Sequence, residues 1–391
     1  MSDKTKVLIA GICSLLLTLG ISRFSYTPLL PLMLEQTPLS ISWGGWLAAF
    51  NYVGYLVGAI IAAQVRSITL KDQLYRAYLI LSVLSTIAMA WTTNVWLWSL
   101  LRFIGGVSTS GGMLLGSALV LNWLLRHHYR GELGIRFMGV GGGIALVAAL
   151  VMALLHIPLD WAEQWVFLAM FGLPLGVVAW LWMPRPDPVG QTTSGQNLKD
   201  HPPSKLLEKG LLISYFFAGI GYVVDATFIV DIVERTPTLS GSGPLAFLLV
   251  GLGAIPAVLI WDRIARNVGY FKAMMYAYLL QVVGILLPLQ GSLVAVIIGA
   301  LLFGATFVGL VSLVLTLSGR FYPTSPARLM GKMTFAYGLA QIIGPAITGE
   351  LTEWLGSYVW GLGLAAGCVV IGALINAKLI PLEENEPALS R

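Results

Sequence analysis

The chain has 391 residues, of which 57% are hydrophobic and only 10% are charged, and its formal net charge at pH 7 is +5. Because a soluble globular domain carries about 25% charged residues, this composition excludes a water-soluble enzyme with a single core. The mean hydropathy of +0.82 is typical of a chain that lies mostly in a membrane.

Apolar segments follow one another along the chain, and each is long enough to cross a bilayer, which takes about 20 residues. The first begins after a short charged start, as a signal peptide does, but no small-residue cleavage site follows, which predicts an uncleaved span. We therefore predict an all-α membrane protein with twelve spans, at residues 7–34, 43–65, 75–93, 96–125, 134–156, 162–182, 210–233, 243–261, 270–289, 292–319, 329–353 and 357–380.

One long polar segment, rich in Pro, Gly, Ser and Thr, separates the first six predicted spans from the last six. It predicts two six-helix bundles joined by a linker. The short polar C-terminus predicts a disordered tail. The predicted divisions are an N-terminal bundle at 1–183, a cytoplasmic linker at 184–209, a C-terminal bundle at 210–382 and a cytoplasmic tail at 383–391.

Basic residues are distributed unevenly between the two sides of the predicted spans. Of the 23 Lys and Arg residues, 20 fall on the side of the N-terminus, among them Arg76 and Arg136, and only Arg235 falls in a segment on the other side. The positive-inside rule then predicts that both termini are cytoplasmic, in a multi-pass protein of the bacterial plasma (inner) membrane. Since the basic charge faces the anionic inner leaflet, it requires no nucleic acid.

The two predicted halves share a weak internal similarity. Residues 20–26 in the first span align without a gap on 219–225 in the seventh, and 53–66 align on 250–263. Such a duplication is typical of secondary transporters.

Several stretches carry a family resemblance. The turn after the eighth predicted span reads WDRIARNVG from Trp261 to Gly269, and span four carries RFIGG from Arg102 to Gly106. Both are similar to signatures of the major facilitator superfamily, although the loop between spans two and three keeps only Arg66 of the first pattern. Residues 22–31 and 51–56 resemble the bacterial YbfB/YjiJ-type branch of that superfamily, and the resemblance covers essentially the whole membrane domain.

The resemblance implies the fold of that superfamily, with two pseudo-symmetric six-helix bundles and a central cavity lined by spans 1, 4, 7 and 10. It also implies transport by alternating access. The resemblance further implies that Asp262, Arg263, Arg266 and Gly269 form a cytoplasmic gating loop. In the family, the aspartate of this loop pairs across the interface between the two halves, and this implies the same role for Asp262.

Three charged residues interrupt the apolar spans, namely Arg23, Arg102 and Asp225. An ionised group in hydrocarbon is costly unless it faces partners or water, so each is a candidate site residue. At a rise of 1.5 Å per residue, all three lie about 21 to 24 Å from the cytoplasmic end, which predicts that they meet. Asp225, read as the single buried acid, is the predicted proton-coupling residue. The predicted substrate cavity consists of Arg23, Tyr26, Asn51, Tyr55, Arg102, Tyr222, Asp225, Tyr337 and Gln341.

More ordinary roles stay open for some of these residues. Arg23 or Asp225 can form a structural salt bridge that clamps the halves together. Hydrogen bonding to neighbouring helices, without contact to a substrate, is the alternative for Asn51, Gln281 and Gln341. Four acids near the span ends are predicted to be interfacial: Glu35, Asp231, Glu350 and Glu353.

Together these features predict a secondary active transporter of a small organic solute, driven by protons and acting as a monomer. Two buried arginines against one aspartate favour an organic anion. No cofactor, metal or nucleic acid is expected. An enzyme is excluded because the chain has four histidines but no G-x-S-x-G or H-E-x-x-H sequence. The alternative is a polytopic membrane receptor or signalling protein without transport.

Overall fold

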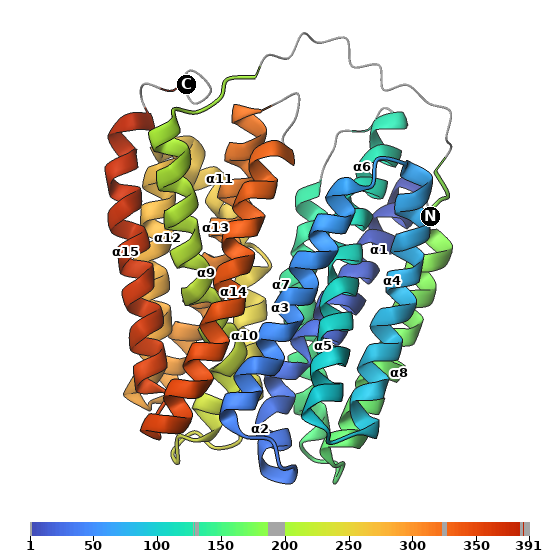
Figure 1. Cartoon of the computed structure of the whole chain (residues 1–391), viewed down its shortest axis with the longest axis vertical. Coiled ribbons are helices and arrows are strands. Elements are labelled where there is room, and N and C mark those ends of the chain that lie inside the picture. Colours follow the sequence, from blue (N-terminus) through green and yellow to red (C-terminus); the bar gives the residue numbers. More distant parts are fainter. Residues whose placement is uncertain are drawn as a thin grey trace.

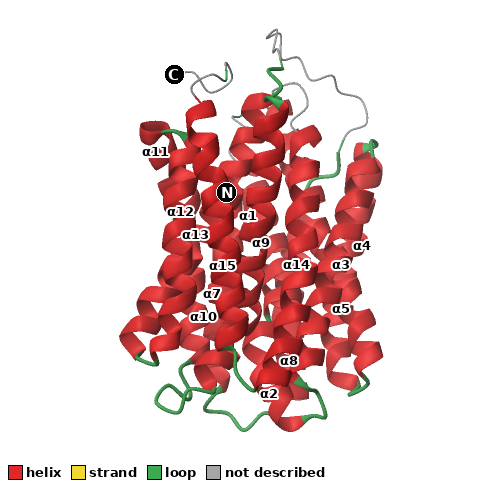
Figure 2. Ribbon diagram, turned by 60° about the vertical axis from the view of Figure 1, so that its left-hand side comes forward, coloured by secondary structure: helices red, strands yellow, loops and turns green. Residues whose placement is uncertain are grey.

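The computed structural model describes residues 2–127, 129, 133–186, 200–322, 327–383 and 386. Over these ranges the chain is helical and contains no strand (Figure 2). This confirms the prediction of an all-α protein. Most of the predicted linker, at 187–199, and most of the predicted tail lie outside the described residues.

Two of the predicted spans contain a π-helical segment between two α-helices. The first span consists of α1 (Asp3–Leu15), a π-helix (Leu16–Phe24) and α2 (Tyr26–Gln36). The fourth consists of α5 (Val95–Ser110), a π-helix (Gly111–Leu115) and α6 (Gly116–Arg126). The remaining α-helices are α3 (Ile41–Gln64), α4 (Ile68–Ala88), α7 (Leu133–Leu154), α8 (Trp161–Trp182), α9 (Lys205–Glu234), α10 (Gly243–Ala254), α11 (Ala257–Val268), α12 (Tyr270–Leu286), α13 (Leu293–Phe321), α14 (Ala327–Leu355) and α15 (Val359–Glu383), with short 3-10 turns at Met89–Trp91 and Leu287–Gln290.

The number of membrane spans is close to the predicted twelve. Within the described residues, ten helical segments are long and apolar enough to cross a membrane, or eleven if α10 and α11, which meet at 45°, form one bent span. Helix α14 falls outside that count, although its 29 residues would extend about 43 Å. A multi-pass membrane protein is therefore confirmed, and the exact number of twelve spans stays a prediction.

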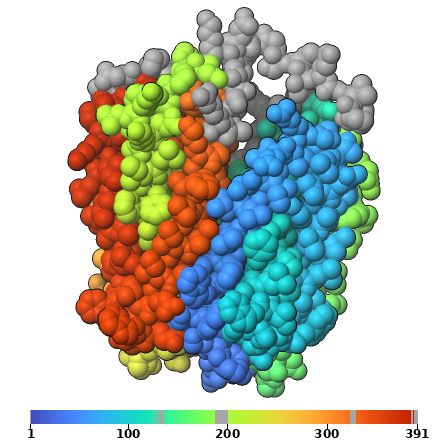
Figure 3. Space-filling model, in the orientation of Figure 1, coloured from blue at the N-terminus to red at the C-terminus, as the bar shows by residue number. Residues whose placement is uncertain are grey.

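The helices gather into two groups, α1–α8 and α9–α15, and α1 begins at the same end of the molecule at which α15 finishes (Figure 1). At this end, called the open end below, a gap separates the two groups (Figure 3). Toward the opposite, closed end the groups touch, and glycines allow the backbones to approach. A Cβ atom on Gly45 of α3 would lie 2.2 Å from the Pro345 carbonyl oxygen of α14, and one on Gly251 of α10 would lie 2.4 Å from the Ala145 nitrogen of α7.

Polar contacts also join the groups at the closed end. The Ser42 backbone N–H donates to Glu353 (2.7 Å), and the Ser42 hydroxyl donates to Glu350 (2.6 Å). Closer to the middle of the molecule, the Thr27 hydroxyl of α2 donates to the Ala226 carbonyl of α9 (2.7 Å). Glu350 and Glu353 are exposed, in keeping with the interfacial position predicted for them, and they additionally bridge the two groups.

Two of the arginines that the sequence places on the side of the N-terminus, Arg76 and Arg136, are buried within the helical bundle. Arg76 lies in α4 and pairs with Asp72 one turn earlier, at 3.0 Å between Nε and Oδ2. Its remaining donors bind the carbonyls of Trp180 (2.6 Å) and Met183 (3.0 Å) at the end of α8. Hydropathy placed the boundary of this span too late, because a fully paired Asp–Arg unit is tolerated inside it.

Arg136 near the start of α7 is fully buried. Its guanidinium donates to the Ser117 hydroxyl and to the Gly112 carbonyl, and it reaches the Ser14 hydroxyl at 3.4 Å. Gly112 lies in the π-helix of the fourth span, where the altered hydrogen-bond pattern is suited to accepting a side-chain donor. The sequence places Arg136 at a span end, and it gives no sign that a neighbouring helix holds acceptors for it.

Candidate functional site

The π-helix in the first span determines where Arg23 lies. Pro28 lacks the N–H that an α-helix would offer to the Phe24 carbonyl, and the π-helix ends at Phe24. Upstream, Gly20 lies against Gly143 of α7, and a Cβ atom there would be 3.0 Å from the Gly143 Cα atom. π-Helical segments within α-helices are frequent at functional sites. Here the segment carries Arg23 at its C-terminal end.

Arg23 is a buried cation without a neutralising acid. Its side chain is 7% exposed, and its Cζ atom lies 4.3 Å from the ring centre of Tyr52 and 5.1 Å from that of Tyr55. Its Nε atom has no hydrogen-bond partner, and no carboxylate is within ion-pair distance, among the residues that the structure describes. Cation–π contacts with the α3 tyrosines therefore provide much of its stabilisation.

Arg102 of α5 lies close to Arg23 but binds different groups. It donates to the Ser22 carbonyl (3.2 Å) and to the Arg23 carbonyl (3.4 Å), and its Cζ atom lies 4.4 Å from the Tyr26 ring centre. The Arg102 carbonyl in turn accepts a hydrogen bond from the Asn51 amide (2.8 Å). Arg102 thus binds the backbone of the first span through its two terminal nitrogens, while its Nε atom, like that of Arg23, has no partner among the described residues.

Asp225 does not join the two arginines. It is 1% exposed, and neither carboxylate oxygen has a hydrogen-bond partner within the described ranges. Gly221, one turn earlier on α9 and on the same face, packs against Val369 of α15 and Ile285 of α12. This face of α9 therefore points into the C-terminal group, and a salt bridge between Arg23 and Asp225 is not formed here. Residue spacing along a helix does not fix the direction in which a side chain points.

Asp225 is not the single buried acid, which corrects the prediction. Asp72 pairs with Arg76. Asp231, predicted to be interfacial, is 2% exposed and accepts hydrogen bonds from Arg235 Nε (2.6 Å) and from the Tyr358 hydroxyl. Against the opposing effect of burial, the Asp231 carboxylate raises the pKa of Arg235, which follows the end of α9. Asp225 differs from both of these acids in having no cationic partner.

Next to Arg23, six aromatic rings from both helix groups form a cluster. Tyr215 and Tyr337 are stacked with ring centres 4.4 Å apart, Tyr222 is stacked on Tyr337 at 5.8 Å, and Tyr222 contacts Phe307 at 4.7 Å. Tyr222 also interacts electrostatically with Arg23, Tyr52 and Tyr55 of the N-terminal group. The aromatic cluster is defined as Tyr52, Tyr55, Tyr215, Tyr222, Phe307 and Tyr337.

The predicted cavity residues divide into those in the cluster and those that brace its surroundings. Tyr55, Tyr222 and Tyr337 belong to the cluster, whereas the sequence reasoning missed Tyr52, Tyr215 and Phe307. Their helical spacing, with Tyr52 three residues before Tyr55 and Tyr215 seven before Tyr222, was the available signal. Tyr26 donates to the Gly44 carbonyl (2.7 Å) within the N-terminal group. Gln341 is buried, and its Oε1 atom has no partner in the part of the chain that is described.

Three residues of the predicted gating loop, Asp262, Arg263 and Arg266, lie within helix α11, and Gly269 lies between α11 and α12. Asp262 pairs with Arg266 on the same helix, at 2.6 Å between Oδ2 and Nη2, so in this conformation it does not reach the other group. Gly269 has a φ of +98°, a conformation that favours glycine. Glu383, predicted to lie in a disordered tail, instead ends α15 and accepts hydrogen bonds from the N–H groups of Tyr270 (2.6 Å) and Phe271 (3.1 Å).

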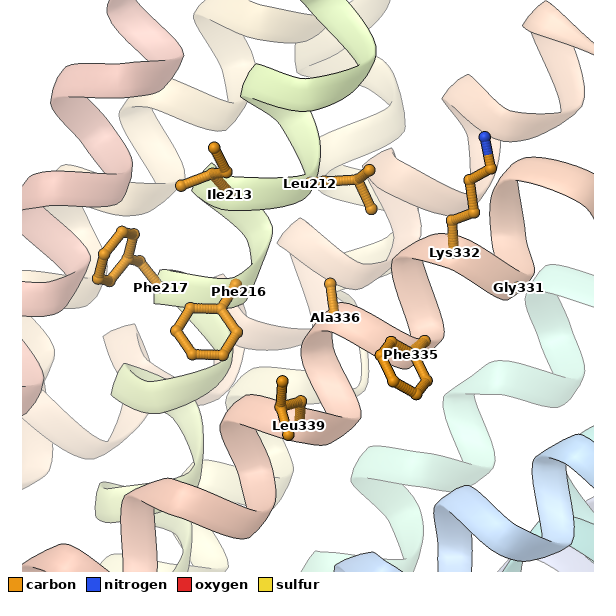
Figure 4. A pocket seen from close by; sticks show the side chains of 9 residues that line it. All are labelled: Leu212, Ile213, Phe216, Phe217, Gly331, Lys332, Phe335, Ala336 and Leu339. Carbon is orange, nitrogen blue, oxygen red and sulfur yellow. The ribbon is translucent and has the colours of Figure 1, made fainter.

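A separate apolar pocket lies between α9 and α14 (Figure 4). It has a volume of about 780 Å³ and shares no lining residue with the aromatic cluster. Its one charged lining residue is Lys332, which pairs with Glu208. The pocket is lined by Leu212, Ile213, Phe216, Phe217, Gly331, Lys332, Phe335, Ala336 and Leu339.

Solved structures share this fold at low sequence identity. The nucleoside transporter NupG superposes with a TM-score of 0.72 at 14% identity, covering 97% of this chain and 99% of that chain. A bacterial homologue of the human lysosomal transporter Spinster, in an inward-facing and occupied conformation, gives a TM-score of 0.71 at 15% identity, covering 97% of this chain and 98% of that chain. These similarities show that the chain shares the fold of these two solved transporter structures.

None of the curated proteins matches the chain in sequence. The family comparison is more specific, because one family profile matches residues 15–377, which includes nearly all of the described helices. The resemblance seen in the sequence motifs is thereby confirmed, and the chain belongs to the family described as "Uncharacterised MFS-type transporter YbfB".

Proposed function

We propose that this chain is a secondary active transporter that carries a small organic anion across the bacterial inner membrane by alternating access, with Asp225 carrying the coupled proton. The observation that supports this proposal best is the environment of Arg23. Its buried guanidinium has no acid within ion-pair distance among the described residues, and it lies beside an aromatic cluster to which both helix groups contribute.

The direction of opening follows from the charge distribution. If both termini are cytoplasmic, as the positive-inside rule predicts, the open end faces the cytoplasm. The conformation is then inward-open. To open outward, the molecule must break the contacts of Ser42 with Glu350 and Glu353 and the bond from Thr27 to Ala226. Rocking of one bundle against the other around a fixed site is the usual route in such folds.

An anionic substrate supplies what Arg23 lacks. A carboxylate on the guanidinium gives an opposite charge and up to two parallel hydrogen bonds. Arg102 is partly engaged, because its two terminal nitrogens already bind the Ser22 and Arg23 carbonyls. Those carbonyls do not neutralise its charge, so the site keeps two positive charges, and Arg23 is the one whose donors we expect the anion to meet.

The position of Asp225 supports a role in coupling. It lies between Tyr222, which is part of the aromatic cluster, and Ala226, whose carbonyl accepts the hydrogen bond from Thr27 across the groups. Its negative charge has no partner in the described structure, so a proton removes a charge from a low-dielectric interior. Protonation of Asp225 therefore changes the charge of a stretch of α9 that contacts the aromatic cluster through Tyr222 and the N-terminal helix group through Ala226.

Two other functions, transport of a neutral nucleoside and ligand sensing without transport, predict different binding and flux. A nucleoside substrate is suggested by NupG, because stacked rings would also hold a base, but a neutral nucleoside leaves the charge of Arg23 unpaired. A receptor without transport would bind ligand and give no flux.

The test is a thermal-shift screen of the purified protein with anionic, neutral and cationic metabolites, followed by flux of the best ligand in proteoliposomes with and without a pH gradient. We expect an anion to bind, with an affinity that falls about 100-fold in Arg23→Gln and less in Arg23→Lys. A wild-type preference for cations, for neutral nucleosides, or unchanged affinity in Arg23→Gln would refute the anion assignment. Binding without flux would favour the receptor.

A further inference from the structure

We propose that the aromatic cluster makes the binding site selective for organic anions that carry a planar aromatic ring. This inference rests on the proposed function, because it assumes that Arg23 binds the anionic group. It goes further by assigning the remainder of the substrate to Tyr215, Tyr222, Tyr337 and their neighbours.

The cluster offers ring faces in a nearly parallel arrangement. The planes of Tyr215 and Tyr337 differ by 24°, and those of Tyr222 and Tyr337 by 23°. Phe307 is tilted by 32° against Tyr222 on the other side. Each of these rings is buried yet not completely enclosed, with exposed fractions of 3 to 8%. Because Tyr215 and Tyr337 already stack on each other at 4.4 Å, an aromatic guest stacks on an outer face of the cluster or meets the ring edges, and both geometries are favourable.

The distance from the guanidinium to the rings matches a compact aromatic acid. The Arg23 Cζ atom lies 4.3 and 5.1 Å from the ring centres of Tyr52 and Tyr55, and Tyr52 in turn is a hydrogen-bonding neighbour of Tyr222. A carboxylate bound to Arg23 therefore places a directly attached ring among the cluster residues. An acid with a flexible aliphatic chain gains the same ion pair but no stacking.

The composition of the cluster favours this reading over simple packing between the groups. The closed-end contacts between the groups use glycines, Ser42 and acidic side chains, with backbones in close approach. By contrast, five of the six rings that define the aromatic cluster are tyrosines, and Phe24, 5.7 Å from Arg23, and Phe303, 6.4 Å from Tyr222, lie beside them. Tyrosine provides a stacking face together with a hydroxyl that binds polar ring substituents.

The inference is tested with matched acids on the purified full-length protein. Benzoate and 2-naphthoate carry planar rings, and cyclohexanecarboxylate and decahydro-2-naphthoate are their saturated counterparts with the same charge and similar size. We expect each aromatic acid to bind about tenfold more tightly than its saturated counterpart. Tyr222→Leu and Tyr337→Leu should reduce that ratio to about one, whereas Tyr222→Phe and Tyr337→Phe should retain it. Tyr276→Leu, on an exposed position of α12, is the matched control and should leave the ratio unchanged.

The outcomes separate this inference from the proposed function. Equal affinities of the paired acids, with binding still lost in Arg23→Gln, would overturn the aromatic selectivity and leave the anion assignment standing. Affinities that do not respond to Arg23→Gln, or no binding of any acid, would overturn both. A ratio that persists in both leucine variants would assign the selectivity to other residues and refute the role of the cluster. The phenylalanine variants keep the packing, so they serve if a leucine variant fails to fold.

Discussion

Arg102 binds the backbone of Arg23: its Nη2 atom lies 3.4 Å from the Arg23 carbonyl oxygen, while its Nη1 atom reaches the Ser22 carbonyl at 3.2 Å. One arginine therefore positions the other, and the two buried cations have different roles. The planar guanidinium is suited to this because it presents several donors in a fixed fork. The Tyr26 ring on its face and the Asn51 amide on its carbonyl complete the support.

The first prediction concerns this support. Arg102→Lys keeps the charge but loses the fork, so we expect affinity for the best anion to fall about tenfold while the preference among anions stays the same. Titration of the anion into wild type, Arg102→Lys and Arg23→Lys checks it. If Arg102 bound the substrate directly, the order of preference among mono- and dianions would change in Arg102→Lys, and that result would contradict the positioning role.

The second prediction concerns the proton. Asp225→Asn should abolish accumulation driven by a pH gradient, because the amide cannot take up and release a proton. Exchange of labelled for unlabelled substrate across the membrane should remain within about threefold of wild type, since Asp225 does not contact Arg23. Glu35→Gln, at an exposed position near the end of α2, is the control. Gradient-driven accumulation at the wild-type level in Asp225→Asn would exclude this residue as the coupling site.

The third prediction concerns the closed end. Gly45→Ala introduces a Cβ atom that would lie 2.2 Å from the Pro345 carbonyl oxygen of the other group, so the backbones must separate there. We expect a loss of about 1 to 3 kcal/mol from the closed-end contact and a shift toward molecules open at that end. Spin labels on the tips of α3 and α14 measure the distance distribution. Gly363→Ala on α15, where nothing lies within 4 Å, should leave the distribution as in wild type.

The fourth prediction concerns Asp262 of α11. Asp262 pairs with Arg266 in this open conformation, and the family resemblance implies that it pairs across the groups when the open end closes. Asp262→Asn should therefore slow transport and leave ligand affinity unchanged, because the site itself is untouched. Initial flux rates and binding constants are compared at equal protein content of the vesicles. Wild-type flux in Asp262→Asn would mean that this loop takes no part in gating.

Hydropathy was sufficient to predict where most of the helices lie along the chain. Helix α8 runs from Trp161 to Trp182 and α3 from Ile41 to Gln64, close to the predicted spans at 162–182 and 43–65. Such boundaries follow from the length of apolar chain that a bilayer requires, which is a local property. The motif around Asp262 and the one beginning at Arg102 were sufficient to predict the superfamily.

The side-chain environment of the site was only partly predictable. Equal depth suggested that Asp225 meets Arg23, but the direction of Asp225 depends on how α9 packs against α12 and α15. Aromatic residues such as Tyr52, Tyr215 and Phe307 occur on lipid-facing and buried helix faces alike, so a single sequence does not distinguish them. The burial of Arg136 was not predictable, because its acceptors, Gly112 and Ser117, belong to another helix.

The carboxylate of Glu383 has a practical consequence for handling the protein. It accepts hydrogen bonds from the first two N–H groups of α12, where a negative charge is favourable at a helix N-terminus. Trimming the chain before this residue, as is common when shortening a polar C-terminus for crystallisation, would leave those donors without an acceptor and loosen the junction between α12 and α15. Affinity tags are best fused after Glu386, whose side chain accepts a hydrogen bond from the Ser204 N–H at the start of α9 (3.1 Å), so that both acids keep their helix partners.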